Sequence, residues 1–277
     1  MPVITLTTDF GLDDAYVASL KGAILSNNPL AHIIDISHSI APQNVLQAAF
    51  ILNMVYRHFP PQTIHVAIVD PEVGSKRRGI ILKTPSAYFV APDNGILSYV
   101  IDDLCQLKNT PSAHDPNREK ITIKEGFEAT AITDPRFWHN PVSSTFHGRD
   151  IFAPVAAGLS LGISIYEFGE KISSLNVLSL TRPCADEQEE VTGQVMHVDH
   201  FGNLITNIKK SDLPRKSVII EIAGYAIHEL SSYYAQREGL LALMGSSGYL
   251  EISLKNGSAR EFLKAAIGDE VRISPEI

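Results

Sequence analysis

The sequence lacks the motifs that most nucleotide-dependent and metal-dependent enzymes carry. Neither the Walker spacing nor the dinucleotide spacing Gly-x-Gly-x-x-Gly occurs in the 277 residues, so NTP and NAD chemistry lose their usual sequence support. His-Glu-x-x-His and Gly-x-Ser-x-Gly are absent too, which removes the usual signals for a zinc protease and for a nucleophile elbow. The sequence therefore predicts neither a resident metal nor an activated serine.

Cysteines, basic runs and long apolar runs are equally scarce. Cys105 and Cys184 fit neither a disulfide framework nor a four-ligand zinc site, so we expect reduced structural thiols. The net charge is −8 and no basic run exceeds Lys76-Arg77-Arg78, which argues against nucleic acid as a partner. No apolar run reaches the roughly 18 residues that span a bilayer, and no signal-peptide pattern is seen. A soluble, cytoplasmic protein with no membrane partner is expected.

The chain is rich enough in apolar residues to form a large core. Apolar residues make up 44% and charged residues 19% of 277 residues, which suits one large domain or two modest ones. Strand-like and helical patterns alternate along the first part of the chain. The strand-like runs are 3–7, 33–36, 64–69, 79–83 and 88–91, and the helical runs are 15–25, 44–58 and 151–161. This alternation predicts an α/β fold whose mostly parallel sheet has helices on both faces.

The second part of the chain has a different pattern. Residues 183–190 are acidic and poor in apolar residues, which predicts a linker after an N-terminal α/β domain at 1–182. Short strand patterns separated by Gly-rich turns follow, and they predict a smaller, β-barrel-like C-terminal domain at 191–277. Within the first domain, residues 109–140 lack periodicity and contain several prolines, so we expect a surface excursion there.

Three acids follow predicted strands of the first domain. Asp9, Asp70 and Asp93 stand at the carboxyl ends of these strands, where open α/β sheets bind ligands. Acids also form turns, so position alone leaves a structural interpretation open. Asp13 and Asp14 precede the helix expected at 15–25, where one of them would serve as N-cap. Taken alone, the three strand-end acids would suggest a metal-dependent hydrolase of a small molecule.

Four segments carry the residues that are most informative about function. The first is Thr7-Thr8-Asp9-Phe10-Gly11, and the second is the run 65–78, which contains Asp70-Pro71-Glu72-Val73-Gly74. The third combines Ala91-Pro92-Asp93-Asn94-Gly95 with the later stretch Thr145-Phe146-His147-Gly148-Arg149-Asp150. The fourth is the run 199–207, which starts with Asp199-His200-Phe201-Gly202-Asn203. In this order, with the acidic linker and the β-rich domain, they resemble the S-adenosylmethionine (SAM) hydrolases. This family is also called SAM hydroxide adenosyltransferases and is related to the fluorinase and chlorinase enzymes. The resemblance runs from Thr5 to Gly268, apart from the excursion.

The resemblance implies a reaction, a substrate and an assembly. Family members cleave SAM at its 5′ carbon, where water or hydroxide displaces L-methionine and leaves adenosine. SAM is then the substrate, and no cofactor is expected. The resemblance also implies a homotrimer, with the ligand held between the N-terminal domain of one subunit and the C-terminal domain of its neighbour.

Three residues match the family positions around the attacking water, namely Asp70, Arg77 and His147. Water has a pKa of about 15.7, so a lone carboxylate generates little hydroxide. Arg77 would stabilise the developing hydroxide, while Asp70 or His147 accepts or orients the proton. The choice of Arg77 over Arg78 follows from the family spacing alone. The structural alternatives are a turn acid, a surface cation and a helix-entry histidine.

A second set of residues matches the family positions that bind SAM. Asp9 resembles the acid that grips the ribose diol, and Asp14 is a weaker match with helix capping as the alternative. Asp199 resembles a contact to the methionine ammonium group, and Phe201 an adenine-stacking ring, with a core position as the alternative. Asn203 can offer a donor and an acceptor to the adenine edge. The remaining matches are Ser246, Ser247 and Glu251 for the amino-acid end, and Ala259 within 256–259 for backbone contacts to adenine.

Glu72 departs from the family pattern, in which glycine is usual at this position. If the position requires a positive φ, a glutamate there costs roughly 1 kcal/mol. The carboxylate of Asp70 argues against a halogenase, because it would repel a halide ion. The alternative function is a SAM- or adenosine-binding protein with little or no turnover, in which Glu72 has disrupted the chemistry.

Overall fold

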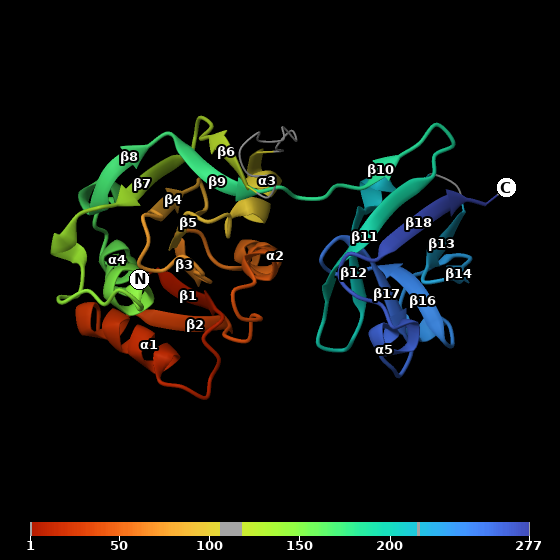
Figure 1. Cartoon of the computed structure of the whole chain (residues 1–277), viewed down its shortest axis with the longest axis horizontal. Helices are drawn as coiled ribbons and strands as arrows, with labels where there is room; N and C mark the ends of the chain where they lie inside the picture. Colours follow the sequence, from red (N-terminus) through yellow and green to blue (C-terminus); the bar gives the residue numbers. More distant parts are fainter. Residues whose placement is uncertain (1, 106–117, 215–216, 277) are drawn as a thin grey trace. The chain divides into compact units, whose positions relative to one another are not determined.

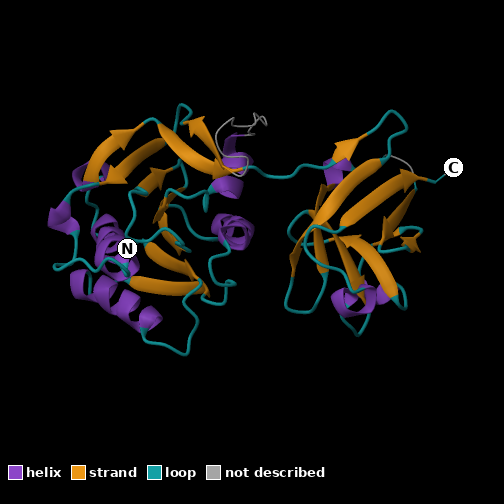
Figure 2. Cartoon of the chain, viewed as in Figure 1, coloured by secondary structure: helices purple, strands orange, loops and turns teal. Residues whose placement is uncertain are grey.

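We analysed a computed structural model of the chain, which describes residues 2–105, 118–214 and 217–276. The chain divides into two compact units, Met1–Leu180 and Thr181–Ile277 (Figure 1). The first unit is mixed α/β and the second is built almost entirely of strands (Figure 2). The predicted fold class is thus confirmed. None of the helices in the described part of the chain has the length and apolar character needed to span a bilayer.

The first unit is organised around a 7-stranded sheet with the order β2-β1-β3-β5-β4-β7-β8. The first four strands in this order pair in parallel, and the last three extend the sheet in antiparallel fashion. A separate two-stranded ribbon pairs β6 with β9. The bounds are β1 Val3–Thr8, β2 His32–Ser37, β3 Thr63–Ile68, β4 Gly79–Lys83, β5 Ala87–Pro92, β6 Arg118–Thr122, β7 Glu128–Ile132, β8 Gly169–Ile172 and β9 Ser174–Leu178.

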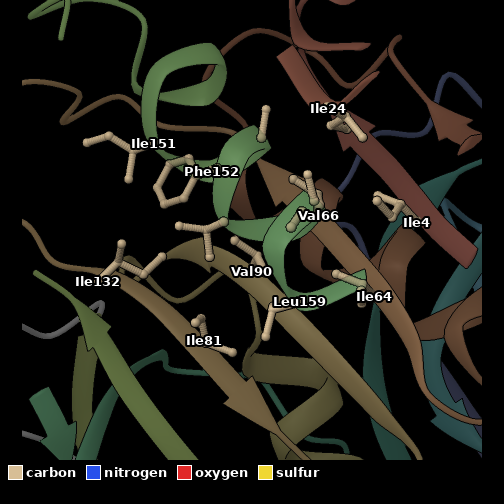
Figure 3. Packing of buried hydrophobic residues seen from close by; sticks show 14 of the residues in the cluster. Ile4, Ile24, Ile64, Val66, Ile81, Val90, Ile132, Ile151, Phe152 and Leu159 are labelled. Atoms are coloured by element: carbon tan, nitrogen blue, oxygen red, sulfur yellow. The ribbon is translucent and has the colours of Figure 1, made fainter. Parts of the chain in front are cut away.

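Helices cover both faces of this sheet, which gives two hydrophobic cores. On one face, α1 and α4 pack against strand residues such as Ile4 and Val66, and Figure 3 shows Ile24 and Phe152 directed into the same core. On the other face, α2 and α3 bury residues such as Leu52. Each large side chain buried in this way contributes about 1.5–3 kcal/mol. The helices are α1 Tyr16–Asn27, α2 Val45–Val55, α3 Ser98–Cys105 and α4 Ala153–Ser160, with short 3₁₀ turns at Tyr56–His58, Pro135–Phe137 and Ile165–Phe168.

Two expectations for the first unit are wrong. Residues 118–140 are not a surface excursion throughout, because β7 is a buried strand of the main sheet and β6 pairs with β9. The small side chains of Ala129 and Ala131 fit this interior but give a weak sequence pattern. Residues 109–117 of the expected excursion lie outside the described residues. Neither Asp13 nor Asp14 caps α1, whose N-cap is Ala15 without a side-chain hydrogen bond.

The second unit is a curled sheet with the order β14-β13-β18-β11-β12-β17-β16-β15, in which every pair is antiparallel except the parallel pair β16 and β15. β14 also approaches β16, which gives the sheet its barrel-like form. Residues 184–185 pair with β11 as β10, so the segment 183–190 folds with this unit instead of forming a free linker. Cys184 is an exposed free thiol. The elements are β10 Cys184–Ala185, β11 Val191–Val198, β12 Leu204–Lys209, β13 Val218–Ile222, β14 Tyr225–Ile227, β15 Leu230–Ser231, β16 Leu240–Met244, β17 Tyr249–Leu254, α5 Ala259–Leu263 and β18 Glu270–Pro275, with 3₁₀ turns at Lys210–Asp212 and Tyr234–Gln236.

Candidate functional site

The loop after β3 places Asp70 and Arg77 at the carboxyl end of the parallel strands. The loop folds tightly, since the N–H of Val73 donates to the carbonyl of Asp70 at 3.3 Å. Gly74 has φ +81°, and a Cβ there would lie 2.4 Å from the carbonyl oxygen of Ser144. Only glycine allows this approach. The loop therefore packs directly against the segment that leads to His147.

Arg77 joins Asp70 and His147 into one cluster. Its Nε donates to Oδ1 and Oδ2 of Asp70 at 3.0 and 2.8 Å, and its Nη2 also donates to Oδ2. The same Nη2 donates to Nδ1 of His147 at 2.9 Å. The side chains of Arg77 and Asp70 are only 6% and 5% exposed, so their charges interact in a largely water-free setting. The structure thus brings together the three residues predicted to surround the attacking water.

The contact with Arg77 determines which nitrogen of His147 carries the proton. A guanidinium group can only donate, so Nδ1 of His147 accepts and the proton of the neutral ring lies on Nε2. Burial lowers the pKa of His147, and the charge of Arg77 lowers it further, although Asp70 and Asp150 act in the opposite direction. At neutral pH the ring therefore presents an Nε2–H donor.

A π-helical turn, Gly148–Phe152, orients the residues around Arg77. The N–H of Ala153 bonds to the carbonyl of Gly148, five residues earlier. Such wide turns often occur at functional sites. The turn begins directly after His147 and ends at Phe152, whose ring lies 5.3 Å from Cζ of Arg77. His147 and Phe152 thus both contact the same guanidinium group.

The neighbouring arginine, Arg78, binds a different aspartate, Asp93. Nε of Arg78 donates to Oδ2 of Asp93 at 3.0 Å, and the backbone and side chain of Asn176 also bond to the Asp93 carboxylate. The side chain of Asp93 is only 1% exposed. Asp93 therefore ties β4 and β5 to β9 and stands outside the Arg77 cluster. This geometry distinguishes Arg77 from Arg78, which the sequence alone could not do.

Asp9 and Asp14 lie at the end of β1 and in the bend before α1. Oδ2 of Asp9 accepts from the backbone N–H of Gln43 at 2.8 Å, and Asp14 is exposed. Asp9 thus holds the loop before α2. Together with Asp70 and Asp93, Asp9 shows that each strand-end acid binds a different partner. Among the residues the structure describes, no group of three or more His, Cys, Asp or Glu is arranged to hold a metal ion.

In the second unit, Asp199 and Asn203 build a tight turn between β11 and β12. Oδ1 of Asp199 accepts from the N–H groups of Phe201 and Asn203, both at 2.9 Å, and its Oδ2 accepts from Nδ2 of Asn203 at 2.9 Å. The turn leaves the ring of Phe201 73% exposed. The core alternative for Phe201 is therefore wrong. The turn also contacts α5, because the N–H of Arg260 donates to the carbonyl of Gly202.

Glu251 is buried in β17 and is held by two hydroxyl groups. Its Oε1 accepts from the hydroxyls of Tyr234 and Ser253 at 2.7 and 2.9 Å. Burial raises the pKa of Tyr234 to about 12, and the Glu251 hydrogen bond adds to this effect. A Cβ at Gly245 would lie 2.6 Å from Oε2 of Glu251, so the turn after β16 passes close to this carboxylate. Ser246 and Ser247 belong to that turn.

The last predicted contact, Ala259, is the fully buried first residue of α5. Ser258 caps this helix by accepting from the N–H of Glu261 at 3.1 Å. Gly202 packs against Ser258, since a Cβ at Gly202 would lie 2.1 Å from the Ser258 hydroxyl. Ala259 therefore lies next to the turn of Asp199.

Sequence reasoning missed Phe152, Tyr234 and Ser253. Phe152 reads as an ordinary helix residue in the sequence, and only the π turn brings it under Arg77. Tyr234 lies in a 3₁₀ turn without a strand or helix pattern, so nothing marked it in advance. The alternation along β17 places Glu251 and Ser253 on one face, which is the signal that could have paired them.

Glu72 does not have the strained backbone that the family pattern suggested. The positive φ in this loop belongs to Gly74 and not to Glu72, which is half-buried. The expected penalty of about 1 kcal/mol therefore does not apply. With glutamate at this position, Arg77 keeps its contacts with both Asp70 and His147.

Comparison with known proteins identifies the family of the chain. Residues 4–169 match the SAM hydroxide adenosyltransferase N-terminal domain, and residues 193–272 match the corresponding C-terminal domain. The chain belongs to this family. The two matches cover both units, including the loop of Asp70, the turn of His147 and the second-unit residues described above.

Curated relatives and a solved structure align with nearly the full length of the chain. The (R)-S-adenosyl-L-methionine hydrolase of Methanocaldococcus jannaschii is 35% identical, and the alignment covers 99% of this chain and 96% of the relative. The Nocardia brasiliensis fluorinase is 26% identical, with 98% and 97% covered. The crystal structure of an uncharacterized conserved protein from Thermotoga maritima superposes with a TM-score of 0.84 at 34% identity, covering 98% of this chain and 100% of that protein.

Proposed function

We propose that this protein hydrolyses SAM to adenosine and L-methionine. The observation that carries the proposal is the buried contact of Arg77 with both Asp70 and His147. Family membership supports it, and so do four relatives at 31–35% identity that carry the name (R)-S-adenosyl-L-methionine hydrolase. We extend the proposal to the (R) epimer at sulfur, which that name specifies.

In the proposed reaction, a water oxygen attacks C5′ of SAM in line with the C5′–S bond. The C5′–O bond forms while the C5′–S bond breaks, and its electron pair neutralises the sulfonium. Methionine therefore leaves as a neutral thioether, and no general acid is required. The protein's task is to present an oriented, desolvated oxygen to C5′.

We assign different roles to the members of the Arg77 cluster. The carboxylate of Asp70 keeps lone pairs beyond those used by Arg77, and it accepts the proton that the water loses. The Nε2–H of His147 donates to the water oxygen, because its Nδ1 is occupied by Arg77. The guanidinium charge stabilises the hydroxide that develops between them. Proton transfer thus goes to Asp70, and His147 orients the nucleophile.

The decisive experiment is to incubate the purified protein with SAM, without added metal or halide, and to follow adenosine and methionine by chromatography. Equal amounts of both products, formed from the (R) epimer, are expected, and Asp70→Asn, shown to be folded by thermal unfolding, should abolish their formation. Bound SAM or adenosine without turnover would instead indicate a binding protein. Glu72→Gly would then be the next variant to test.

We assign the second-unit residues to the nucleoside and amino-acid parts of SAM. Asp9 and Asp14 of the first unit would serve the ribose. The exposed ring of Phe201 suits stacking on adenine, and Asn203 suits its polar edge. Asp199 and Glu251 are the carboxylates suited to the methionine ammonium group. Ser246, Ser247 and Ala259 would add contacts from the turn after β16 and the start of α5.

Glu251→Gln should raise KM for SAM more than it lowers kcat. The replacement keeps the shape of the side chain but removes the charge that would attract an ammonium group. We expect KM to rise about tenfold, which corresponds to roughly 1.4 kcal/mol of binding energy. Steady-state kinetics at several SAM concentrations give both constants. Tyr234→Phe is the matched control, since it removes one hydrogen bond to Glu251 and leaves the charge, and a smaller rise in KM is expected.

We also propose that the protein acts as a cytoplasmic homotrimer whose sites combine residues from two subunits. The resemblance to the family suggests this assembly, and the exposed Phe201 ring supports a site that needs a second surface. Co-expression of an Arg77→Lys chain with an Asp199→Ala chain tests it. If sites form between subunits, random mixing restores about a quarter of the sites, whereas a site within one chain restores none.

A further inference from the structure

Asp150 is fully buried, although no step of the proposed reaction uses it. It lies three residues after His147, within the π turn, and its exposed fraction is 0%. Burial acts to raise the pKa of its carboxyl group, but hydrogen bonds from Arg149 and from the backbone of Ser143 outweigh burial and lower it. Asp150 is therefore a carboxylate held inside the fold.

The carboxylate of Asp150 reaches back along the chain to residues that precede His147. Its Oδ2 accepts from the N–H of Ser143 at 2.8 Å, and Arg149 donates to both oxygens at 2.6 and 3.0 Å. Its backbone carbonyl accepts from the N–H of His139 at 2.7 Å. These bonds close the segment 139–150 on itself, with His147 inside the closed loop.

The closed segment 139–150 is also held by the loop that carries Arg77. Ser144 follows the residue that Asp150 binds, and its carbonyl is the atom against which Gly74 packs. The loop between Asp70 and Arg77 thus contacts the closed segment at Ser144 and again at His147. A shift of Ser143 would therefore move both contacts at once.

We propose that Asp150 is a positioning residue, which fixes the loop that presents His147 to Arg77. Its kinetic consequence rests on the proposed function, because it concerns the same site. The charged groups that act on the His147 ring are Arg77, Asp70 and Asp150. Asp150 thus sets both where the ring lies and part of the electric field that the ring experiences.

Asp150→Asn tests this role, with Asp93→Asn as the matched control. Both replacements neutralise a buried carboxylate that pairs with an arginine, but the Asp93 carboxylate binds Arg78 and Asn176 instead of the His147 loop. We expect Asp150→Asn to lower kcat at least tenfold, because small displacements of reacting groups are costly, with KM changed less than twofold. NMR titration of the His147 ring should show a lower pKa than in the wild type. Asp93→Asn should leave both kcat and this titration within experimental error.

Several outcomes would overturn the proposal. One is an unchanged kcat in folded Asp150→Asn, and another is an equal loss of kcat in Asp93→Asn, which would mean a merely structural role. If Asp150→Asn does not fold, the Arg149→Met/Asp150→Asn double variant removes both charges and is expected to show the same loss. If the wild type fails to hydrolyse SAM, the proposed function fails, but the NMR titration still decides whether Asp150 controls His147. An unchanged titration there overturns this inference.

Discussion

Arg77→Lys should reduce kcat by about two orders of magnitude while the protein remains folded. Lysine keeps the positive charge beside Asp70, but its compact ammonium group cannot donate in a fork to both carboxylate oxygens and also reach Nδ1 of His147. Loss of one preorganised donor at a developing negative charge typically costs 10²–10³-fold, which is about 2.7–4 kcal/mol. KM for SAM should change little, because Arg77 has no proposed contact with the nucleoside or the amino-acid end.

The lysine variant is preferable to an alanine variant. Arg77→Ala would leave Asp70 charged, buried and unpaired, and breaking such a pair costs about 3–5 kcal/mol of stability. An unfolded protein would then imitate a catalytic loss. Thermal unfolding of Arg77→Lys, measured beside its activity, separates the two effects.

Arg78→Lys is the matched control for Arg77→Lys. The two arginines are adjacent, and each donates Nε and Nη2 to a buried aspartate, but Arg78 binds Asp93 and the carbonyl of Ser174 instead of the His147 cluster. A modest loss of stability with kcat near the wild-type value is expected. Equal losses of kcat in the two variants would show that the Arg77 cluster has no special part in the reaction.

Much of the fold was predictable because its buried strands have strong local patterns. Residues 79–83 form a strand with the bounds that their apolar run predicted, and the second unit consists mainly of strands, as its short strand patterns indicated. The pattern fails where tertiary contacts replace local ones. β7 is a short run of small residues whose place in the sheet depends on pairing with β4 and β8, and no local signal fixes that pairing.

The sequence named Asp70, Arg77 and His147, which the structure brings together, but it did not predict how they are connected. The family spacing predicted Arg77 as the site arginine, whereas only the folded loop shows that Arg77 binds Asp70 and that Arg78 binds Asp93. The tautomer of His147 also depends on a contact in the folded protein, because the proton is assigned to Nε2 only once Arg77 is seen to donate to Nδ1. Phe152 reaches Arg77 through a π turn, and such turns have no sequence pattern comparable to that of a strand.

Stability should fall steeply below pH 6.5, and His65 should account for much of the loss. This residue is fully buried in β3, where its ring stacks on Phe89 at 5.1 Å and Nδ1 bonds to the hydroxyl of Thr5 at 2.8 Å. Its Nε2 has no hydrogen-bond partner within the described residues. Burial lowers the pKa of His65 from 6.5 to about 4. Between these values the unfolded chain binds a proton that the folded protein does not, so stability is lost as pH falls.

The expected loss is about 2.4 kcal/mol between pH 7 and pH 4.5, since one pKa unit corresponds to 1.36 kcal/mol. Urea unfolding of the wild type and of His65→Gln, at pH 7 and at pH 4.5, measures it. Glutamine is polar and does not titrate, so the variant should lose less stability than the wild type over this interval. Acidic groups whose pKa is lowered in the fold, such as Asp150, contribute equally to both proteins and cancel in the comparison. Equal pH dependence in His65→Gln and the wild type would mean that His65 titrates alike in the folded and unfolded chains, and that water reaches its ring.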